Sequence, residues 1–309
     1  MEKQSYRVHI TFFVATLLLA IGLKAEAQTK PETSIKTLTL GGVFQDPSEP
    51  VEEHFRPLAA FVARKLSPPG DIKGSVIVAT SAAQMMKLLE EKRVDFYMES
   101  PYPTYLINHL GAAALLLRRW KGGMAEYHSL IFTAKDRGID RLEDLRGKII
   151  VFEDPGSTSG YFLPKLFLLK KGFSVVEKPS LGAKVLAGEI GYTFAGAGKK
   201  VINLVLQKTV VAGAFSNHDH ASLDENSKAA IAILGESEPL PRHLVSVRKD
   251  LPEPVIKRLK EILLNMHQDE EGQKILRQTG NTTKFDSLPG GEELVRRKLV
   301  ELFRPRGKK

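Results

Sequence analysis

The feature that most constrains this chain is a run of three hydroxyl side chains between a predicted strand and a predicted helix. The apolar segment 148–152 predicts a buried strand, and the spacing of apolar residues over 163–171 predicts a helix. A strand that passes directly into a helix is the repeating unit of an α/β fold. Proline is favourable in the first turn of a helix and costly further in. Pro164 therefore leaves open whether the helix begins at the hydroxyl run or just after it, near residues 160–161.

The hydroxyl run itself predicts an anion site. Ser157, Thr158 and Ser159 stand where the helix begins, with Gly160 and Tyr161 directly after them. The first N–H groups of a helix have no partner within it, and the helix dipole makes that end partly positive. Hydroxyls that converge on free N–H groups can bind an anion without a metal. Simple N-capping is the alternative, although one cap needs only one hydroxyl.

The first 27 residues have the pattern of a secretion signal. Lys3 and Arg7 precede an apolar run over residues 10–23, and the Ala-Glu-Ala sequence at 25–27 fits a signal-peptidase site. The run is shorter than the about 20 residues of a membrane span. We therefore expect cleavage after Ala27 and a periplasmic protein, with an uncleaved N-terminal anchor as the alternative.

The composition is that of a soluble globular protein without disulfide bonds. The chain is 42% hydrophobic and 26% charged, and it has no cysteine. A mature chain of this length buries a core large enough to do without disulfides. The formal charge is +9, but the basic residues are scattered among acidic ones, and only the tail at 304–309 is a basic cluster. This distribution predicts a weak attraction for anionic solutes and no nucleic-acid partner.

Predicted strands and helices alternate along most of the chain. This order implies mostly parallel sheets with helices on their faces, in which ligands bind at the carboxyl ends of strands. The Gly41-Gly42 turn, a predicted loop at 100–105 and the hydroxyl run all follow predicted strands. The predicted strands are 35–40, 76–78, 94–98, 115–117, 130–132, 148–152, 173–176, 210–215 and 243–247. The predicted helices are 51–66, a helix capped by Ser81, 163–171, 201–207, 254–266, 270–278 and 292–303.

Three motifs of catalytic or metal sites are incomplete. Residues 156–160 place threonine where a nucleophile elbow needs serine. Residues 198–200 lack the leading glycine and the hydroxyl of a phosphate-binding loop. His218 and His220 lie two residues apart without a clear third ligand, which is more typical of a polar loop than of a metal site. We predict no catalytic residue, no metal and no cofactor.

The sequence around the hydroxyl run resembles the periplasmic phosphate/phosphite/phosphonate-binding proteins of ABC importers. The most specific part is LEDLRGK at 142–148, then Phe152, then STSGY at 157–161. The resemblance extends over nearly the whole mature chain. Its further segments are 93–102, 211–217, Pro241, 245–248 and 250–252.

The resemblance implies an α/β protein with the two-lobed type II periplasmic binding fold. Each lobe would be a mixed, mostly parallel sheet flanked by helices, and two crossing strands would join the lobes as a hinge. Lobe one would comprise residues 28–132 plus 242–309, and lobe two would be the inserted residues 133–241. The solute would bind between the lobes and close them.

The resemblance also implies a set of ligand-binding residues from both lobes. They are Ser157, Thr158 and Ser159 with the adjacent Gly160 and Tyr161, a lobe-one hydroxyl from Ser100, Tyr102 or Tyr105, and Asn217 and Asp219 in lobe two.

Two departures from the family's pattern bear on the ligand. Many relatives have a histidine between the positions of Tyr161 and Asn217, and this chain has none there. It also has no acidic residue between Gly191 and Ser216 that could pair with a ligand ammonium group. We therefore expect a small tetrahedral oxyanion or a plain phosphonate rather than an aminoalkylphosphonate. Asp219 would accept a proton from hydrogen phosphate and repel sulfate.

The implied function is that of an extracytoplasmic solute-binding protein, and not of an enzyme. It would deliver a phosphorus oxyanion to an ABC permease in the inner membrane and act as a monomer. The alternative is a sensor that signals oxyanion occupancy to a membrane histidine kinase. Enzymes that use this fold, such as pyrimidine-synthesising relatives, need a nucleophilic or metal centre, and this chain has no cysteine to provide one.

Overall fold

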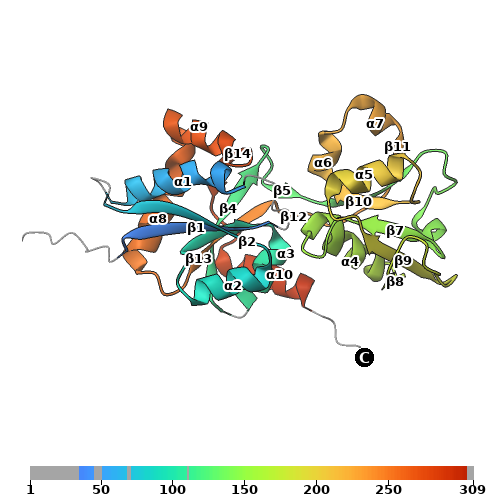
Figure 1. The fold of residues 1–309 in the computed structure, drawn as a ribbon, viewed down its shortest axis with the longest axis horizontal. Coiled ribbons are helices and arrows are strands. Elements are labelled where there is room, and N and C mark those ends of the chain that lie inside the picture. Colours follow the sequence, from blue (N-terminus) through green and yellow to red (C-terminus); the bar gives the residue numbers. More distant parts are fainter. Residues whose placement is uncertain (1–34, 45–50, 68–70, 110, 305–309) are drawn as a thin grey trace, which may run out of the picture. The chain divides into compact units, whose positions relative to one another are not determined.

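The computed structural model describes residues 35–44, 51–67, 71–109 and 111–304 (Figure 1). The predicted signal at 1–27 and its cleavage site lie outside the described residues. Within the described residues, no helix is both long and apolar enough to cross a membrane.

The first lobe is built on a six-stranded mixed sheet in the order β14-β4-β13-β3-β1-β2. Strands β2, β1 and β3 are parallel, whereas β13 is antiparallel to both of its neighbours and β14 is antiparallel to β4. The strands are β1 (Thr37–Val43), β2 (Lys73–Ala79), β3 (Phe96–Glu99), β4 (Ala113–Lys121), β13 (His243–Arg248) and β14 (Thr282–Asp286).

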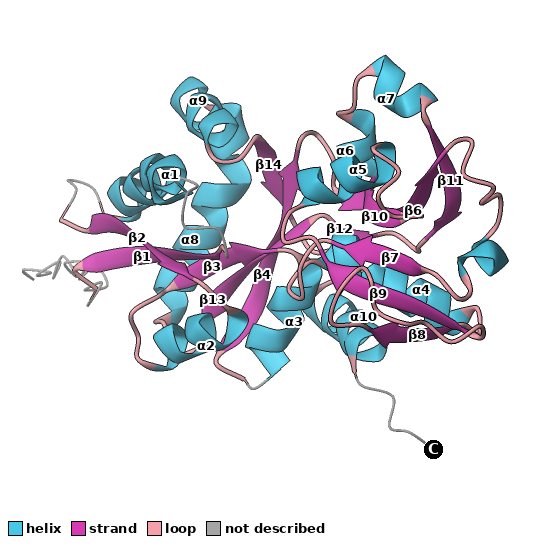
Figure 2. Cartoon of the chain, turned by 45° about the vertical axis from the view of Figure 1, so that its right-hand side comes forward, coloured by secondary structure: helices cyan, strands magenta, loops and turns pink. Residues whose placement is uncertain are grey.

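Helices cover both faces of the first sheet, and the alternation of side chains along β3 shows why. Phe96 and Met98 lie in one core cluster, and Tyr97 between them lies in another, because successive strand residues point to opposite faces. In Figures 1 and 2, α1 lies on one side of the sheet and α2 and α3 on the other. The helices of this lobe are α1 (Val51–Leu66), α2 (Ala82–Glu90), α3 (Pro101–His109), α8 (Glu253–Asn265), α9 (Glu270–Gln278) and α10 (Glu292–Phe303).

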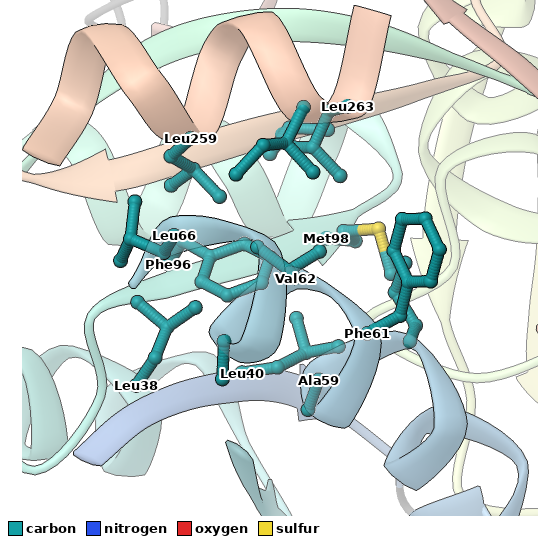
Figure 3. Close-up of a cluster of buried hydrophobic side chains, with 14 of the residues drawn as sticks. Leu38, Leu40, Ala59, Phe61, Val62, Leu66, Phe96, Met98, Leu259 and Leu263 are labelled. Carbon is teal, nitrogen blue, oxygen red and sulfur yellow. The ribbon is translucent and has the colours of Figure 1, made fainter. Parts of the chain in front are cut away.

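Helix α1 has the bounds that its apolar spacing predicts. Leu58 and Val62, one helical turn apart, are both fully buried. They belong to the same core cluster as Leu38 of β1 and Leu259 of α8, and Figure 3 shows α1 and α8 contributing to this cluster. The buried stripe of α1 therefore fixes this helix on the sheet.

The second lobe has its own six-stranded mixed sheet, in the order β11-β6-β10-β7-β9-β8. Strands β10, β7, β9 and β8 are parallel, and β6 is antiparallel to β10 and β11. The strands are β6 (Ser129–Ala134), β7 (Ile149–Phe152), β8 (Ser174–Glu177), β9 (Glu189–Phe194), β10 (Gly213–Ser216) and β11 (Ile231–Glu236). The helices are α4 (Leu163–Lys170), α5 (Gly198–Leu206), α6 (Asn217–Ala221) and α7 (Glu225–Ala229).

Two short antiparallel strands connect the lobes. The chain leaves the first sheet through β5 (Glu126–Tyr127) and returns through β12 (Leu240–Pro241), which pairs with β5. The predicted α/β fold with two crossing strands is therefore confirmed. The predicted lobe boundary after residue 132 falls inside β6, whereas residue 242 lies between β12 and β13.

Some local predictions were wrong. The predicted loop at 100–105 is largely the helix α3, because Pro101 and Pro103 lie in a first turn, where proline costs no hydrogen bond. The strands β9, β11 and β14 and the short helices α6 and α7 were not predicted. The predicted polar loop at residues 218–220 lies in α6.

Candidate functional site

A cavity of about 380 Å³ is lined by residues of both lobes. Its wall includes the ends of β1 and β3 in lobe one and the loop after β7 in lobe two, as expected for ligand sites at the carboxyl ends of strands. Its polar lining residues are Glu99, Ser100, Lys121, Tyr127, Glu153, Asp154, Ser157, Thr158, Ser159, Asp219, Arg242 and His243.

The helical segment begins within the hydroxyl run, at Thr158, and not at Gly160 or Tyr161. Residues Thr158–Phe162 form a π-helical turn that continues into α4. Ser157 caps this turn, because its Oγ accepts a hydrogen bond from the N–H of Gly160 at 2.9 Å. The same hydroxyl donates to Oε2 of Glu153 at 2.7 Å. Ser157 therefore has a capping role in addition to its place in the cavity wall.

Thr158 connects the hydroxyl run to lobe one. Its buried Oγ1 donates to Oγ of Ser100 at 2.9 Å and accepts from the N–H of Tyr102 at 2.9 Å. Ser100 and Tyr102 flank the start of α3, so this one hydroxyl joins the first turns of two helices. Its position therefore depends on how the two lobes meet.

Ser159 is the member of the run whose hydroxyl has no bond to the described part of the protein. Its carbonyl oxygen accepts from Oγ of Ser129 at 2.6 Å, which fixes the backbone at the cavity wall. The first N–H groups of a helical turn lack partners within it. The Ser159 hydroxyl and this helix start can therefore contact a solute.

Asp219 also lies in the cavity wall and has protein partners. Its Oδ2 accepts from the N–H of Ser216 at 3.0 Å and from Oγ of Ser216 at 2.6 Å, and so caps α6. In the described part of the chain, no group of three or more His, Cys, Asp or Glu side chains is placed to hold a metal ion.

Two of the predicted tyrosines belong to an aromatic cluster instead of the cavity wall. The ring of Tyr102 stacks on Phe162 with 4.4 Å between centroids, and Tyr105 packs against Phe303 at 5.6 Å. Burying these rings against other aromatic side chains is more favourable than exposing them to a polar cavity.

Three other predicted residues also lie outside the cavity wall. Tyr161 packs in the core of lobe two, 4.9 Å from the ring of Phe194. The side chain of Asn217 accepts from the N–H of His128 at 3.1 Å, and Gly160 is buried close to Glu153. The structure thus brings five predicted residues to the cavity, namely Ser100, Ser157, Thr158, Ser159 and Asp219. The other five do not line it, namely Tyr102, Tyr105, Gly160, Tyr161 and Asn217.

The cavity has basic groups that the sequence reasoning missed. Lys121 ends β4, Arg242 follows β12, and His243 begins β13. The local signal was weak, because each of them is an isolated basic residue at a strand end. They come together through the pairing of β4 with β13, which places His243 opposite Arg119, and through the pairing of β5 with β12, which Arg242 follows.

His243 is neutral and carries its ring proton on Nε2. The buried guanidinium of Arg119 lies 3.3 Å from Nδ1 of His243, and since arginine can only donate, Nδ1 must accept. Burial, together with the positive charges of Arg119, Arg242 and Lys121, holds the pKa of His243 well below its usual value. Arg119 itself stays charged at neutral pH, since burial lowers its pKa only to about 10.

Two carboxyl groups of the cavity have raised pKa values. Burial raises the pKa of Glu99 to about 7, although the N–H groups of Val43 and Ser100 donate to it at 2.8 and 3.1 Å. Burial also raises the pKa of Glu153, and the nearby charges of Asp154 and Asp219 raise it further.

Comparisons with known proteins agree with this geometry. The model of a family described as "ABC transporter, phosphonate, periplasmic substrate-binding protein" matches residues 41–288. The structure of XAC2383 from Xanthomonas citri bound to chloride ion is 30% identical, with a TM-score of 0.79, over 87% of this chain and 96% of that one. The same protein bound to ATP gives a TM-score of 0.76 at the same identity and coverage.

A more distant solved structure shows the same fold, and a curated protein is similar in sequence over part of the chain. PhnD1 from Prochlorococcus marinus, in complex with methylphosphonate, is 16% identical with a TM-score of 0.63, over 86% of this chain and 97% of that one. The phosphate-import protein PhnD of Mycolicibacterium smegmatis is 24% identical over 172 residues, which are 52% of each chain. The chain thus spans about half the length of this curated relative.

Proposed function

The chain belongs to the family of periplasmic substrate-binding proteins of ABC phosphonate transporters, and on this basis we propose that it captures a small phosphorus oxyanion in its interlobe cavity and delivers it to an ABC permease. The observation that carries the proposal is the hydroxyl run at a helix start, inside a cavity whose wall also includes the cationic side chains of Lys121 and Arg242. Hydroxyl groups, helix-start N–H groups and cations all favour a negatively charged solute.

The ligands of the related structures support an anion. XAC2383 is described with chloride and with ATP, and PhnD1 with methylphosphonate. In this chain, the hydroxyls of Ser159 and Ser100 would donate to the oxyanion. Those of Ser157 and Thr158 would do so by turning away from Glu153 and Ser100, to which they donate in this structure. Asp219 would accept a proton from a protonated oxyanion, which sulfate lacks at neutral pH. The predicted residues that do not line the cavity would support the residues that do. They are Gly160, Tyr161, Tyr102, Tyr105 and Asn217.

The family description and the N-terminal pattern support a periplasmic location after cleavage following Ala27. The protein would act there as a monomeric binding protein rather than as an enzyme. The alternative role is signalling to a membrane histidine kinase. A histidine-kinase gene beside the gene of this protein, in place of a permease gene, would favour signalling over delivery.

The proposal is tested by titration calorimetry of the purified protein with phosphate, phosphite and methylphosphonate, with sulfate for comparison. We expect at least one of the three to bind, and Ser159→Ala to lower its affinity by about 1.5–3 kcal/mol, the value of a hydrogen bond to a charged group. Ser180→Ala, at an exposed serine outside the cavity, is the matched control and should bind as the wild type does. Absence of both heat and a thermal shift with all three anions would disprove the proposal.

A further inference from the structure

Two cations of the cavity have no acceptor in the part of the chain that the structure describes. The side chain of Lys121 makes no hydrogen bond or ion pair there, and neither does the side chain of Arg242, whose Nε is buried without a partner. Arg242 is only 8% exposed, and its guanidinium lies over the ring of Tyr127, 4.4 Å from the centroid. Arg118, which lies on the same strand as Lys121 and points away from the cavity, has the usual arrangement, since it pairs with Asp286 at 2.7 Å.

The carboxylates of the cavity, in contrast, all have protein donors. Glu99 accepts from two backbone N–H groups, Glu153 accepts from the hydroxyl of Ser157, and Asp219 caps α6. The N–H of Gly156 donates to Oδ1 of Asp154 at 2.7 Å. The cavity therefore contains satisfied acids and unsatisfied cations, and the group that would complete it is negatively charged.

The cations also repel one another. Burial, followed by the charges of Arg242 and Arg119, lowers the pKa of Lys121 to about 8, while Glu99 and Asp219 oppose the change. Buried charges without partners are unfavourable, and a solute that brings an anionic group to them removes this cost. The arrangement is therefore better explained by a bound anion than by a contribution to stability.

Tyr127 places these cations next to the hydroxyl run. It is 1% exposed, and its hydroxyl has no hydrogen bond of good geometry, although the hydroxyl of Thr158 is near enough to affect its pKa. Burial raises the pKa of Tyr127 to about 12, so the group remains a donor at neutral pH. The cations over Tyr127 and the hydroxyls around Thr158 are thus two adjacent places for negative charge.

The cavity is large enough for a ligand that carries two negatively charged groups. Its volume of about 380 Å³ lies within the roughly 300–1,000 Å³ of pockets that hold organic ligands. A single tetrahedral oxyanion held by the hydroxyl run would leave Lys121 and Arg242 without a counter-charge.

We infer that Lys121, Arg242 and Tyr127 form a second anion subsite, and that the ligand is a small organophosphorus compound with a second acidic group. This inference depends on the proposed function, because it assigns the first acidic group to the hydroxyl run. The second group is a carboxylate or another phosphoryl group, both of which match the planar donor pattern of a guanidinium.

Calorimetry at pH 7.5 with methylphosphonate, phosphonoacetate and methylenediphosphonate tests the inference. We expect at least one of the two-headed probes to bind at least about tenfold more tightly than methylphosphonate, since it gains charge-assisted hydrogen bonds. Preference for phosphonoacetate identifies a carboxylate as the second group, and preference for methylenediphosphonate identifies a phosphoryl group.

Variants of the two cations test whether these residues cause the preference for a two-headed probe. Arg242→Gln should reduce the ratio of the two dissociation constants to below about threefold, and Lys121→Gln provides the same comparison if the first variant does not fold. Lys260→Gln removes an equal charge from an exposed site on α8 and should retain the ratio.

Three results would overturn the inference. Methylphosphonate that binds as tightly as both two-headed probes rejects the second subsite and leaves the proposed function intact. A preference that survives in both Arg242→Gln and Lys121→Gln rejects these residues. Absence of binding by all three probes rejects this inference, and it rejects the proposed function as well only if phosphate and phosphite also fail to bind.

Discussion

Glu99 is the acidic residue of the cavity with the most unusual environment. Its carboxyl is buried between the backbone N–H groups of Val43 and Ser100, with the charges of Lys121 and Arg119 nearby. These neighbours favour the ionised form, but desolvation exceeds them and raises the pKa from 4.5 to about 7. Glu99 therefore exchanges its proton near neutral pH.

This pKa predicts how stability depends on pH. The unfolded chain releases the proton of Glu99 near pH 4.5, whereas the native protein retains it until near pH 7. The contribution of Glu99 to the free energy of unfolding is therefore present at low pH and is lost as the pH rises through this window. Glu99→Gln removes the dependence, so the variant should gain on the order of 3 kcal/mol relative to the wild type between pH 4.5 and 8. Urea denaturation across this range measures the gain, and a constant difference would contradict the assignment.

Among single residues, only those of the site that are adjacent in the chain could be predicted from the sequence. Ser157, Thr158 and Ser159 form a local pattern, so their helix start could be predicted. Lys121 and Arg242 are separated by the whole of lobe two, and neither has a local signal. Their meeting at one cavity depends on β5 and β12, which are each too short to be recognised from an apolar run.

Among the elements, α1 and β2 make an unusually close contact. A Cβ atom added at Gly74 of β2 would lie 2.4 Å from the carbonyl carbon and oxygen of Ala59 in α1. Backbone atoms cannot move aside as a flexible side chain can, so only glycine fits where this helix crosses this strand.

Gly74→Ala should therefore destabilise the protein by about 1–3 kcal/mol, the usual cost of overpacking a core. Gly182→Ala is the matched control, because a Cβ atom there meets nothing within 4 Å and Gly182 has no positive φ. The control should leave the free energy of unfolding unchanged or raise it by less than about 1 kcal/mol. Equal effects of the two substitutions in urea denaturation would show that the contact is not close in solution.

The amphipathic helices were the most predictable elements. α1, α9 and α10 have the bounds that their apolar periodicity predicts, because burial of one face decides both their ends and their orientation. β9 was missed because its glycine and polar residues do not form an apolar run, and its pairing with β7 and β8 decides its conformation. Such strands depend on neighbours that are distant in sequence.

For the molecule as a whole, contact between the lobes includes an aromatic cluster beside the hinge. Phe162, at the entry to α4 in lobe two, lies 4.4 Å from Tyr102 and 4.7 Å from Phe303 between ring centroids. Tyr102 and Phe303 belong to α3 and α10 of lobe one. This cluster stabilises the arrangement in which the cavity wall is complete.

Phe162→Ala should therefore increase the radius of gyration of the ligand-free protein, measured by small-angle X-ray scattering. Phe167→Ala is the matched control, since Phe167 packs within lobe two, against Gly235 and the core around Leu168. It should lower the melting temperature without changing the radius of gyration. An unchanged radius in Phe162→Ala would show that the aromatic cluster does not hold the lobes together.

Tyr127 lies in β5, and Arg242 directly follows β12, so part of the cavity floor is built on the pivot between the lobes. A force applied at a pivot has almost no lever arm. A solute group held there adds affinity but little torque. Substitutions of Tyr127 or Arg242 should therefore change affinity more than the extent of rotation between the lobes.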